Sequence, residues 1–195
     1  MENRKIYIVL TRTNTFLSRL ISFIKDDEYT HASISLDRHL SRMYSFGRKY
    51  TYNPFVGRFV KENLNEGVYG RHDNLYGLVM EIEVSREQYV KAENLINEFI
   101  LNKDLYKYNY IGLVNCLLNR ESCNNHRFLC SEFVYYILNK SNIVNFNKSG
   151  NLVRPQDLLN IKGKIVFKGN LKNINWSRKV YNRDEFLQRY QYAEI

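Results

Sequence analysis

Residues 127–138, which read R-F-L-C-S-E-F-V-Y-Y-I-L, constrain the fold more than any other stretch of this sequence. From Cys130 onward, apolar residues recur at i, i+3, i+4, i+7 and i+8, which is the spacing of one helix face. Asn124 and Asn125 lie just upstream, in a polar run typical of a loop. The sequence therefore predicts a loop that leads into a helix, with Cys130 in its first turn on the face that packs inward.

A cysteine at this position has particular chemistry. Unpaired backbone N–H groups and the positive end of the helix dipole favour an anion there, so the thiol of Cys130 ionises more readily. A thiolate is the nucleophile of cysteine enzymes, but it needs a base within hydrogen-bonding reach. Because buried cysteines on apolar helix faces are also ordinary core residues, the presence of a partner base distinguishes the two interpretations.

The chain has four histidines that could serve as this base. His39 lies in a predicted hairpin turn, His72 in a Gly/Asn loop and His126 in the loop before Cys130. His31 differs because it lies on a predicted strand, and a strand fixes the direction of its side chains. On that strand, His31 shares a face with two serines at alternate positions, opposite an apolar face. We therefore expect His31 to be the base.

The remaining pattern predicts an α+β domain. Alternation, apolar runs and capping residues predict strands at 5–11, 29–36, 42–48, 78–84 and 164–167, and helices at 16–24, 86–101, 109–118, 130–138 and 155–159. Ser85 and Gln88 form a capping box that opens one of these helices. Residues 49–73 are expected to be a long loop. The order predicts one domain, with its core at about 5–168 and a polar tail at 169–195.

Composition limits the class of protein. In 195 residues, 44% hydrophobic and 14% aromatic content fit a folded globular chain. The formal charge is +9, from 29 Lys and Arg against 20 Asp and Glu. A basic surface attracts nucleic acid, anionic lipid or an acidic substrate. The basic residues form no block of five or six, however, which argues against a nucleic-acid-binding protein.

The sequence also suggests a compartment. The N-terminal residues lack the long apolar segment of a secretory signal, and no stretch approaches the roughly 18 apolar residues of a membrane span. Cys116, Cys123 and Cys130 are an odd number of cysteines without a metal-site spacing, so reduced thiols are expected. These observations predict a cytoplasmic protein without a transmembrane segment.

Three segments together resemble a known family. Y-T-H-A-S-I-S-L at 29–36, M-Y-S-F-G-R at 43–48 and F-L-C-S-E-F-V-Y-Y-I-L at 128–138 look like the circularly permuted branch of NlpC-type papain-like cysteine hydrolases. V-R-P-Q-D-L at 153–158 is similar to the segment that closes such domains. In this branch the histidine strand precedes the cysteine helix. The branch includes amidases, peptidases and lecithin retinol acyltransferase-like enzymes, and the resemblance implies a papain-like fold with an antiparallel sheet packed against helices.

The resemblance implies Cys130 as the nucleophile and His31 as the general base and acid. A third polar residue on the next strand would orient the imidazole. Relatives carry Glu, His, Asp or Asn there, whereas this chain offers only Ser45 and Tyr44, of which Ser45 is favoured. The backbone N–H of Cys130 would stabilise the oxyanion. Tyr7 is a candidate for the second oxyanion donor, which the sequence does not assign.

The expected activity is hydrolysis of an amide bond through a thioester, without metal or organic cofactor. A peptide, another amide or an acyl lipid would be the substrate, and an aromatic-rich loop at 50–69 would form one wall of its cleft. The alternatives are a thioesterase or acyltransferase on lipid acyl groups, and a catalytically weak module that binds lipid or peptide. A metal site at Cys123, His126 and Cys130 has poor ligand count and spacing.

Overall fold

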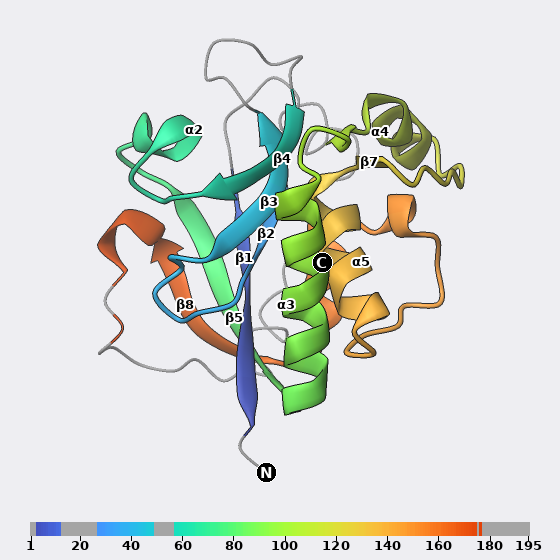
Figure 1. The fold of residues 1–195 in the computed structure, drawn as a ribbon. Coiled ribbons are helices and arrows are strands. Elements are labelled where there is room, and N and C mark those ends of the chain that lie inside the picture. The colour runs from blue at the N-terminus through green and yellow to red at the C-terminus, as the bar shows by residue number, and fades with distance from the viewer. Residues whose placement is uncertain (1–2, 13–26, 49–56, 175, 177–195) are drawn as a thin grey trace, which may run out of the picture.

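A mixed α+β arrangement with an eight-stranded sheet appears in the computed structural model, which describes residues 3–12, 27–48, 57–174 and 176 (Figure 1). The predicted helix at 16–24 lies outside these residues. The strands are β1 (Arg4–Thr11), β2 (His31–Ser35), β3 (Met43–Arg48), β4 (Gly57–Glu62), β5 (Tyr76–Val84), β6 (Lys107–Tyr108), β7 (Arg127–Phe128) and β8 (Lys164–Asn170).

The sheet runs in the order β7-β6-β4-β3-β2-β1-β5-β8. All neighbouring strands are antiparallel except the short pair β6 and β7. The register places His31, the first residue of β2, opposite Thr11, the last residue of β1. His31 therefore lies at the end of the sheet where β1 leaves it, and not in the middle of a strand.

The described residues also form four α-helices and three 3₁₀-helices. They are α2 (Gly67–Gly70), α3 (Arg86–Leu101), α4 (Tyr110–Leu117) and α5 (Cys130–Lys140), with 3₁₀-helices η1 (Gly150–Leu152), η2 (Pro155–Asn160) and η3 (Leu171–Asn173). Helix α3 begins with the predicted capping box between Ser85 and Gln88. The two side chains satisfy backbone N–H groups that have no partner within the helix.

Two apolar clusters lie on the two faces of the sheet. The larger one joins the sheet to α3 and α5, because alternate residues of the strands point toward those helices. On β1 and β2 these are Ile6, Ile8, Leu10, Ala32 and Ile34. A smaller cluster lies on the other face, and includes Tyr7, Val9, Met43, Tyr69 and Leu171. Both faces of β1 are thus covered, as its continuous apolar run predicts.

The structure confirms the coarse prediction of an α+β fold and corrects some of its details. The expected loop at 49–73 contains a full strand, β4, and the short helix α2. The strand at the end of the chain continues to Asn170 and is followed by η3, in which Leu171 is fully buried, so the polar tail does not begin at 169. None of the described helices has the length and apolar character needed to cross a bilayer.

Candidate active site

The structure brings together the two residues expected to do chemistry. Cys130 is the first residue of α5 and is 6% exposed. The His31 imidazole and the backbone N–H groups of Ala32 and Ser131 lie close enough to the Cys130 side chain to favour its thiolate form. The hydroxyl of Ser131 donates to the Val153 carbonyl at 2.6 Å, which holds the first turn of α5 against the following segment. Residues about one hundred positions apart thus meet at a helix N-terminus.

This contact changes the acid–base properties of both groups. Burial by itself raises the pKa of the Cys130 thiol, but the positive charge and hydrogen bond of His31, with the backbone N–H groups, lower it below its ordinary value of 9.0. Burial lowers the pKa of His31, yet Glu62 and Cys130 raise it to about 10. Opposite charges therefore stabilise each other, so this environment favours the thiolate form of Cys130 and the imidazolium form of His31.

The carboxylate that supports His31 comes from the last residue of β4. Oε1 of Glu62 lies 2.9 Å from Nε2 of His31, and their side chains are 11% and 15% exposed. The hydroxyl of Ser33 donates to Oε2 of Glu62, and the hydroxyl of Tyr69 donates to the same oxygen at 3.3 Å. Glu62 therefore occupies the Nε2 side of the imidazole, which leaves Nδ1 as the ring nitrogen available to another group.

The contact between His31 and Glu62 passes beside Gly47 of β3. Glu62 and His31 lie on β4 and β2, which are separated by β3. A Cβ atom at Gly47 would make ordinary van der Waals contact with both groups, at 3.4 Å from Oε1 of Glu62 and 3.7 Å from Cε1 of His31. The two side chains therefore meet across the intervening strand, next to Gly47.

Ser45 does not hold the imidazole. Its fully buried hydroxyl donates to the Ala32 carbonyl at 2.6 Å, so it joins β3 to β2. Tyr44, the other candidate, packs in the core, where its ring stacks on Phe59 at 5.8 Å between centroids. Glu62 takes the position for which Ser45 was expected.

Tyr7, a candidate oxyanion donor, lies away from Cys130. Its hydroxyl donates to Oε2 of Glu81 at 3.0 Å, and its register partner is Ser35, at the opposite end of β2 from His31. A strand rises about 3.3 Å per residue, so the four-residue offset corresponds to roughly 13 Å. Tyr7 therefore joins β1 to β5 and does not reach the site.

Two other tyrosines are close enough to be affected by the site. Burial, followed by the charge of Glu62, raises the pKa of Tyr69 well above its ordinary value. Burial, followed by the charge of Cys130, does the same for Tyr108, the last residue of β6. Both phenols are therefore protonated at neutral pH, and Tyr69 acts as a hydrogen-bond donor to Glu62. No local pattern in the sequence marks either tyrosine for this environment.

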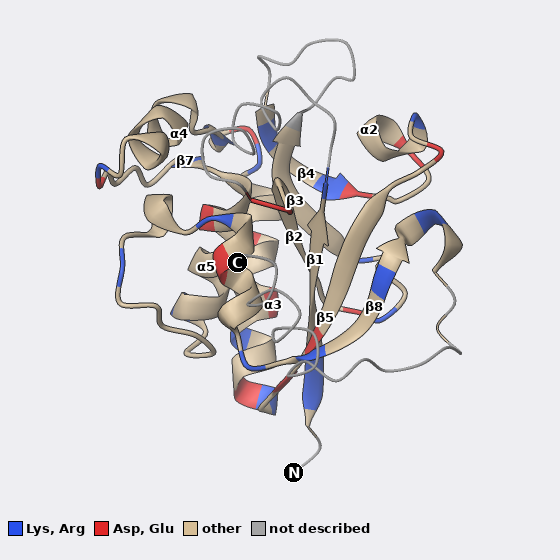
Figure 2. Ribbon diagram, turned by 180° about the vertical axis from the view of Figure 1, so that it is seen from behind, with Lys and Arg blue, Asp and Glu red and all other residues tan. Residues whose placement is uncertain are grey.

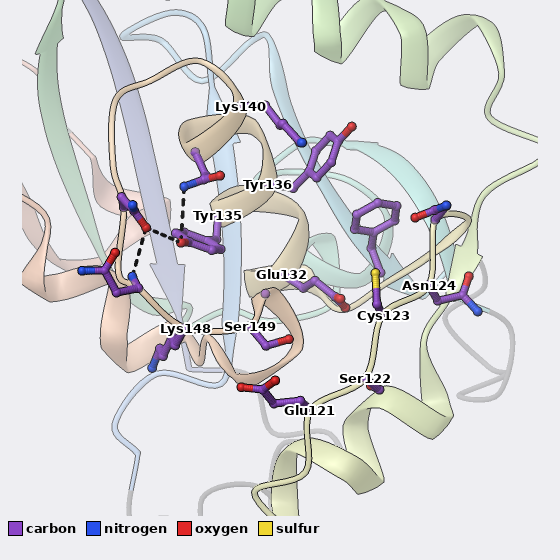
Figure 3. A pocket seen from close by; sticks show the side chains of 16 residues that line it. Glu121, Ser122, Cys123, Asn124, Glu132, Tyr135, Tyr136, Lys140, Lys148 and Ser149 are labelled. Atoms are coloured by element: carbon purple, nitrogen blue, oxygen red, sulfur yellow. Dashed lines mark hydrogen bonds between the residues drawn. The ribbon is translucent and has the colours of Figure 1, made fainter.

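The other two cysteines lie apart from this chemistry. Cys116 is buried among core residues of α4. Cys123 is exposed and lines a cavity of about 700 Å³ between the 121–125 loop, α5 and residues 145–150 (Figure 3). Glu132, from the first turn of α5, also lines this cavity. The described residues contain no group of three or more His, Cys, Asp or Glu side chains that could hold a metal ion.

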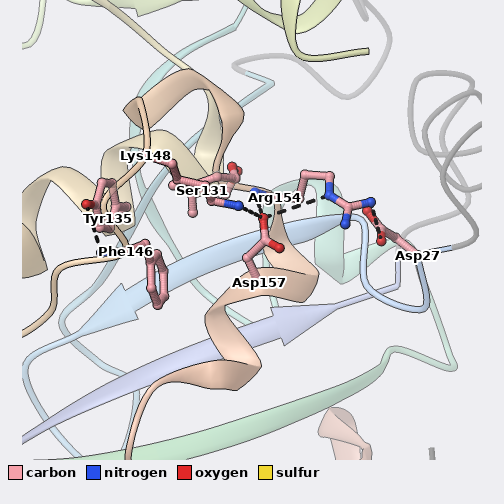
Figure 4. Close-up of polar contacts among 8 residues, drawn as sticks. Asp27, Ser131, Tyr135, Phe146, Lys148, Arg154 and Asp157 are labelled. Atoms are coloured by element: carbon pink, nitrogen blue, oxygen red, sulfur yellow. Dashed lines mark hydrogen bonds and ion pairs between the residues drawn. The ribbon is translucent and has the colours of Figure 1, made fainter. Parts of the chain in front are cut away.

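A network of ion pairs fixes the segment that follows α5 (Figure 4). Nη1 of Arg154 lies 3.0 Å from Oδ1 of Asp27, and the backbone N–H of Arg154 donates to Asp157 at 2.7 Å. Lys148 pairs with the same carboxylate at 2.7 Å. This network joins the residues before β2 to the segment that receives the Ser131 hydroxyl, so it supports the elements that carry His31 and Cys130.

Comparison with known proteins gives no independent assignment. No protein-family model, curated protein or solved structure matches this chain. The interpretation of the site therefore depends on the contacts among Cys130, His31 and Glu62 themselves.

Proposed function

We propose that this protein is a cysteine hydrolase that cleaves an amide bond through a thioester intermediate. The observation that carries the proposal is the chain of contacts from Cys130 through His31 to Glu62. A nucleophile paired with a base, which is oriented in turn by a third group, is the arrangement that covalent catalysis requires. The order of these residues, with histidine before cysteine, also supports a permuted papain-like fold as part of the proposal.

The proposed reaction has two steps. The thiolate of Cys130 attacks the substrate carbonyl, and the backbone N–H of Cys130 stabilises the oxyanion. The tetrahedral intermediate collapses as His31 gives its proton to the leaving amine, which breaks the C–N bond and leaves a thioester. Water then attacks the thioester while His31 takes its proton, and the carboxylic acid product leaves with the thiolate restored.

Glu62 has a positioning and electrostatic role in this reaction. It holds Nε2 of His31 at 2.9 Å and stabilises the imidazolium form that donates the proton. The catalytically weak binding module was suggested by the absence of a strong third residue next to His31. A buried carboxylate at that position favours hydrolysis over such a module.

The proposed substrate is a peptide or an acyl amide. The alternative is that the same chemistry hydrolyses or transfers lipid acyl groups. A cavity of about 670 Å³ has Glu62 on its wall and is bordered by residues 63–66, which belong to the segment expected to form one wall of the substrate cleft. Residues 50–56 of that segment lie outside the described part of the chain. The proposed compartment is the cytoplasm, where three free thiols are kept reduced.

A chemically activated acyl ester tests the proposal, because it forms a covalent thioester with a competent thiol. Peptide mass spectrometry should find the acyl group on Cys130 in the wild-type protein, and the adduct should disappear with time as water resolves it. His31→Ala should lose both formation and turnover, while Cys123→Ala should keep both. An adduct that accumulates on Cys123, with none on Cys130, would contradict the proposal.

A further inference from the structure

Helix α4 exposes an apolar face that has no partner in the chain as described. Its inner face is buried through Leu113 and Cys116. The outer residues Ile111, Val114 and Leu118, at i, i+3 and i+7, are 73%, 55% and 58% exposed. Of the eight large apolar side chains exposed among the described residues, six lie between residues 100 and 118. Scattered single exposures are ordinary, whereas a gathered set marks an interaction surface.

Basic residues flank this helix on both sides. Lys107, on β6 just before α4, is the register partner of Arg127 on β7, and both are exposed. Arg120 follows α4, and its backbone N–H bonds the Asn115 carbonyl at 2.8 Å, so the chain turns back onto the helix end there. Residues 100–127 contain four Lys or Arg against two acidic residues. One of the two acidic residues, Asp104, pairs with Arg58.

We propose that the outer face of α4, formed by Ile111, Val114 and Leu118, docks on an anionic lipid bilayer. An apolar helix face flanked by Lys and Arg is the pattern of a helix that lies in the bilayer interface. The flanking cations complement anionic headgroups, and the net charge of +9 acts in the same direction. Protein partners, in contrast, are usually held by aromatic or Arg anchors in pockets, whereas these three side chains are aliphatic.

Charge alone does not select the side of the protein that carries α4. In Figure 2, blue and red segments are interspersed over the strands and helices, so the net positive charge is spread over the molecule. Such a distribution attracts an anionic surface without selecting one side of the protein. The three aliphatic side chains of α4 supply the selection, because among the described residues they belong to the side where exposed apolar side chains gather, and that side gains from entering the boundary between headgroups and acyl chains.

The docking face is connected to the helix that carries the nucleophile. The Asn109 side chain caps α4 by accepting the Gly112 N–H at 2.8 Å, and its amide nitrogen lies 3.4 Å from Oε2 of Glu132, in the first turn of α5. Bilayer docking through α4 therefore anchors the molecule close to the start of α5. The proposal does not depend on the proposed activity, because it is tested by binding alone.

Vesicle flotation tests the proposal directly. The full chain is mixed with phosphatidylcholine vesicles, or with vesicles that contain roughly one-third phosphatidylserine. The wild-type protein should float with the anionic vesicles and bind them less as salt is added. The triple variant Ile111→Ser, Val114→Ser and Leu118→Ser should partition about tenfold or more weakly. The control pair Tyr76→Ser and Val90→Ser, also at exposed apolar positions but outside α4, should bind as the wild type does.

A second variant keeps the test informative if the triple variant does not fold. Lys107→Gln with Arg127→Gln changes only exposed side chains, and should reduce the preference for anionic over neutral vesicles. Failure of the wild type to float with either vesicle, or equal flotation of wild type and triple variant, would overturn the proposal. Light scattering gives the other outcome that would overturn it. If the wild type is a dimer that does not bind vesicles, and the triple variant is a monomer, the outer face of α4 mediates self-association instead.

Discussion

Nε2 of His31 lies 2.9 Å from Oε1 of Glu62, although the two residues are on strands separated by β3. His31 thus has two acidic neighbours, the carboxylate of Glu62, which contacts Nε2, and the thiol of Cys130. A neutral histidine would gain little from Glu62, whereas an imidazolium gains a charge-assisted hydrogen bond. The predictions on catalysis follow from this preference for the charged form.

Glu62→Gln should narrow the pH range of activity from its basic side. The active pair exists above the lowered pKa of Cys130 and below the pKa of His31, which is about 10. Removal of the Glu62 charge lowers the pKa of His31, so the basic limb of the pH–rate profile should move to lower pH. Because His31 without Glu62 carries its positive charge less readily, it stabilises the thiolate less and the pKa of Cys130 rises. Where that pKa lies above the pH of the assay, each unit of the rise reduces the fraction of thiolate by about tenfold.

The control for Glu62→Gln is Glu66→Gln, a nearby exposed acidic residue whose side chain accepts a hydrogen bond from Asn63 at 3.0 Å. It should leave the pH–rate profile unchanged. A basic limb that is the same in wild type and Glu62→Gln would show that Glu62 does not set the charge state of His31.

Ser45→Ala should reduce stability but leave the pH–rate profile unchanged. The Ser45 hydroxyl donates to the buried Ala32 carbonyl, so its removal should lower the free energy of unfolding by about 1–3 kcal/mol. Urea denaturation measures this loss, and the pH–rate profile of the same variant measures any effect on His31. A shifted profile with unchanged stability would restore Ser45 as the residue that orients the imidazole.

Arg154→Ala should destabilise the protein. Asp27 has a side chain only 3% exposed, and the variant leaves this carboxylate buried without the Arg154 cation. The expected loss in the free energy of unfolding is about 2–3 kcal/mol, at the lower end for a buried pair because Arg154 is partly exposed. Arg58→Ala is the matched control, since its partner Asp104 is 81% exposed, and should cost less than about 1 kcal/mol. Equal losses would contradict this role of Asp27 and Arg154.

The sequence predicted the elements whose pattern is local. Helix α3 follows from its capping box and periodicity, and the first position of α5 follows from the apolar spacing after Cys130. His31 stood out because alternation placed it on a strand. These features depend on near neighbours in the chain, which a single sequence displays directly.

Glu62 could not be found in the same way. It ends β4, a strand in a stretch where Pro54 and several glycines make the sequence pattern predict a loop. Its partner His31 is 31 positions earlier and lies two strands away, so no local pattern in the sequence joins the two residues. One local feature does point to the strand that carries Glu62. In R-F-V-K-E at 58–62, apolar and charged residues partly alternate before the turn at 63–66.

The alkylation rate of Cys130 as a function of pH tests the central claim most directly. Iodoacetamide reacts with thiolates, and peptide mass spectrometry separates Cys130 from the exposed Cys123, which serves as an internal reference. Cys130 should titrate below 9.0, the ordinary pKa of a cysteine thiol. In His31→Ala, with the variant still folded, the pKa of Cys130 should rise because the stabilising imidazolium is gone. A Cys130 that titrates at or above 9.0 in the native protein, or one whose rate is unaffected by His31→Ala, would contradict the thiolate–imidazolium pair.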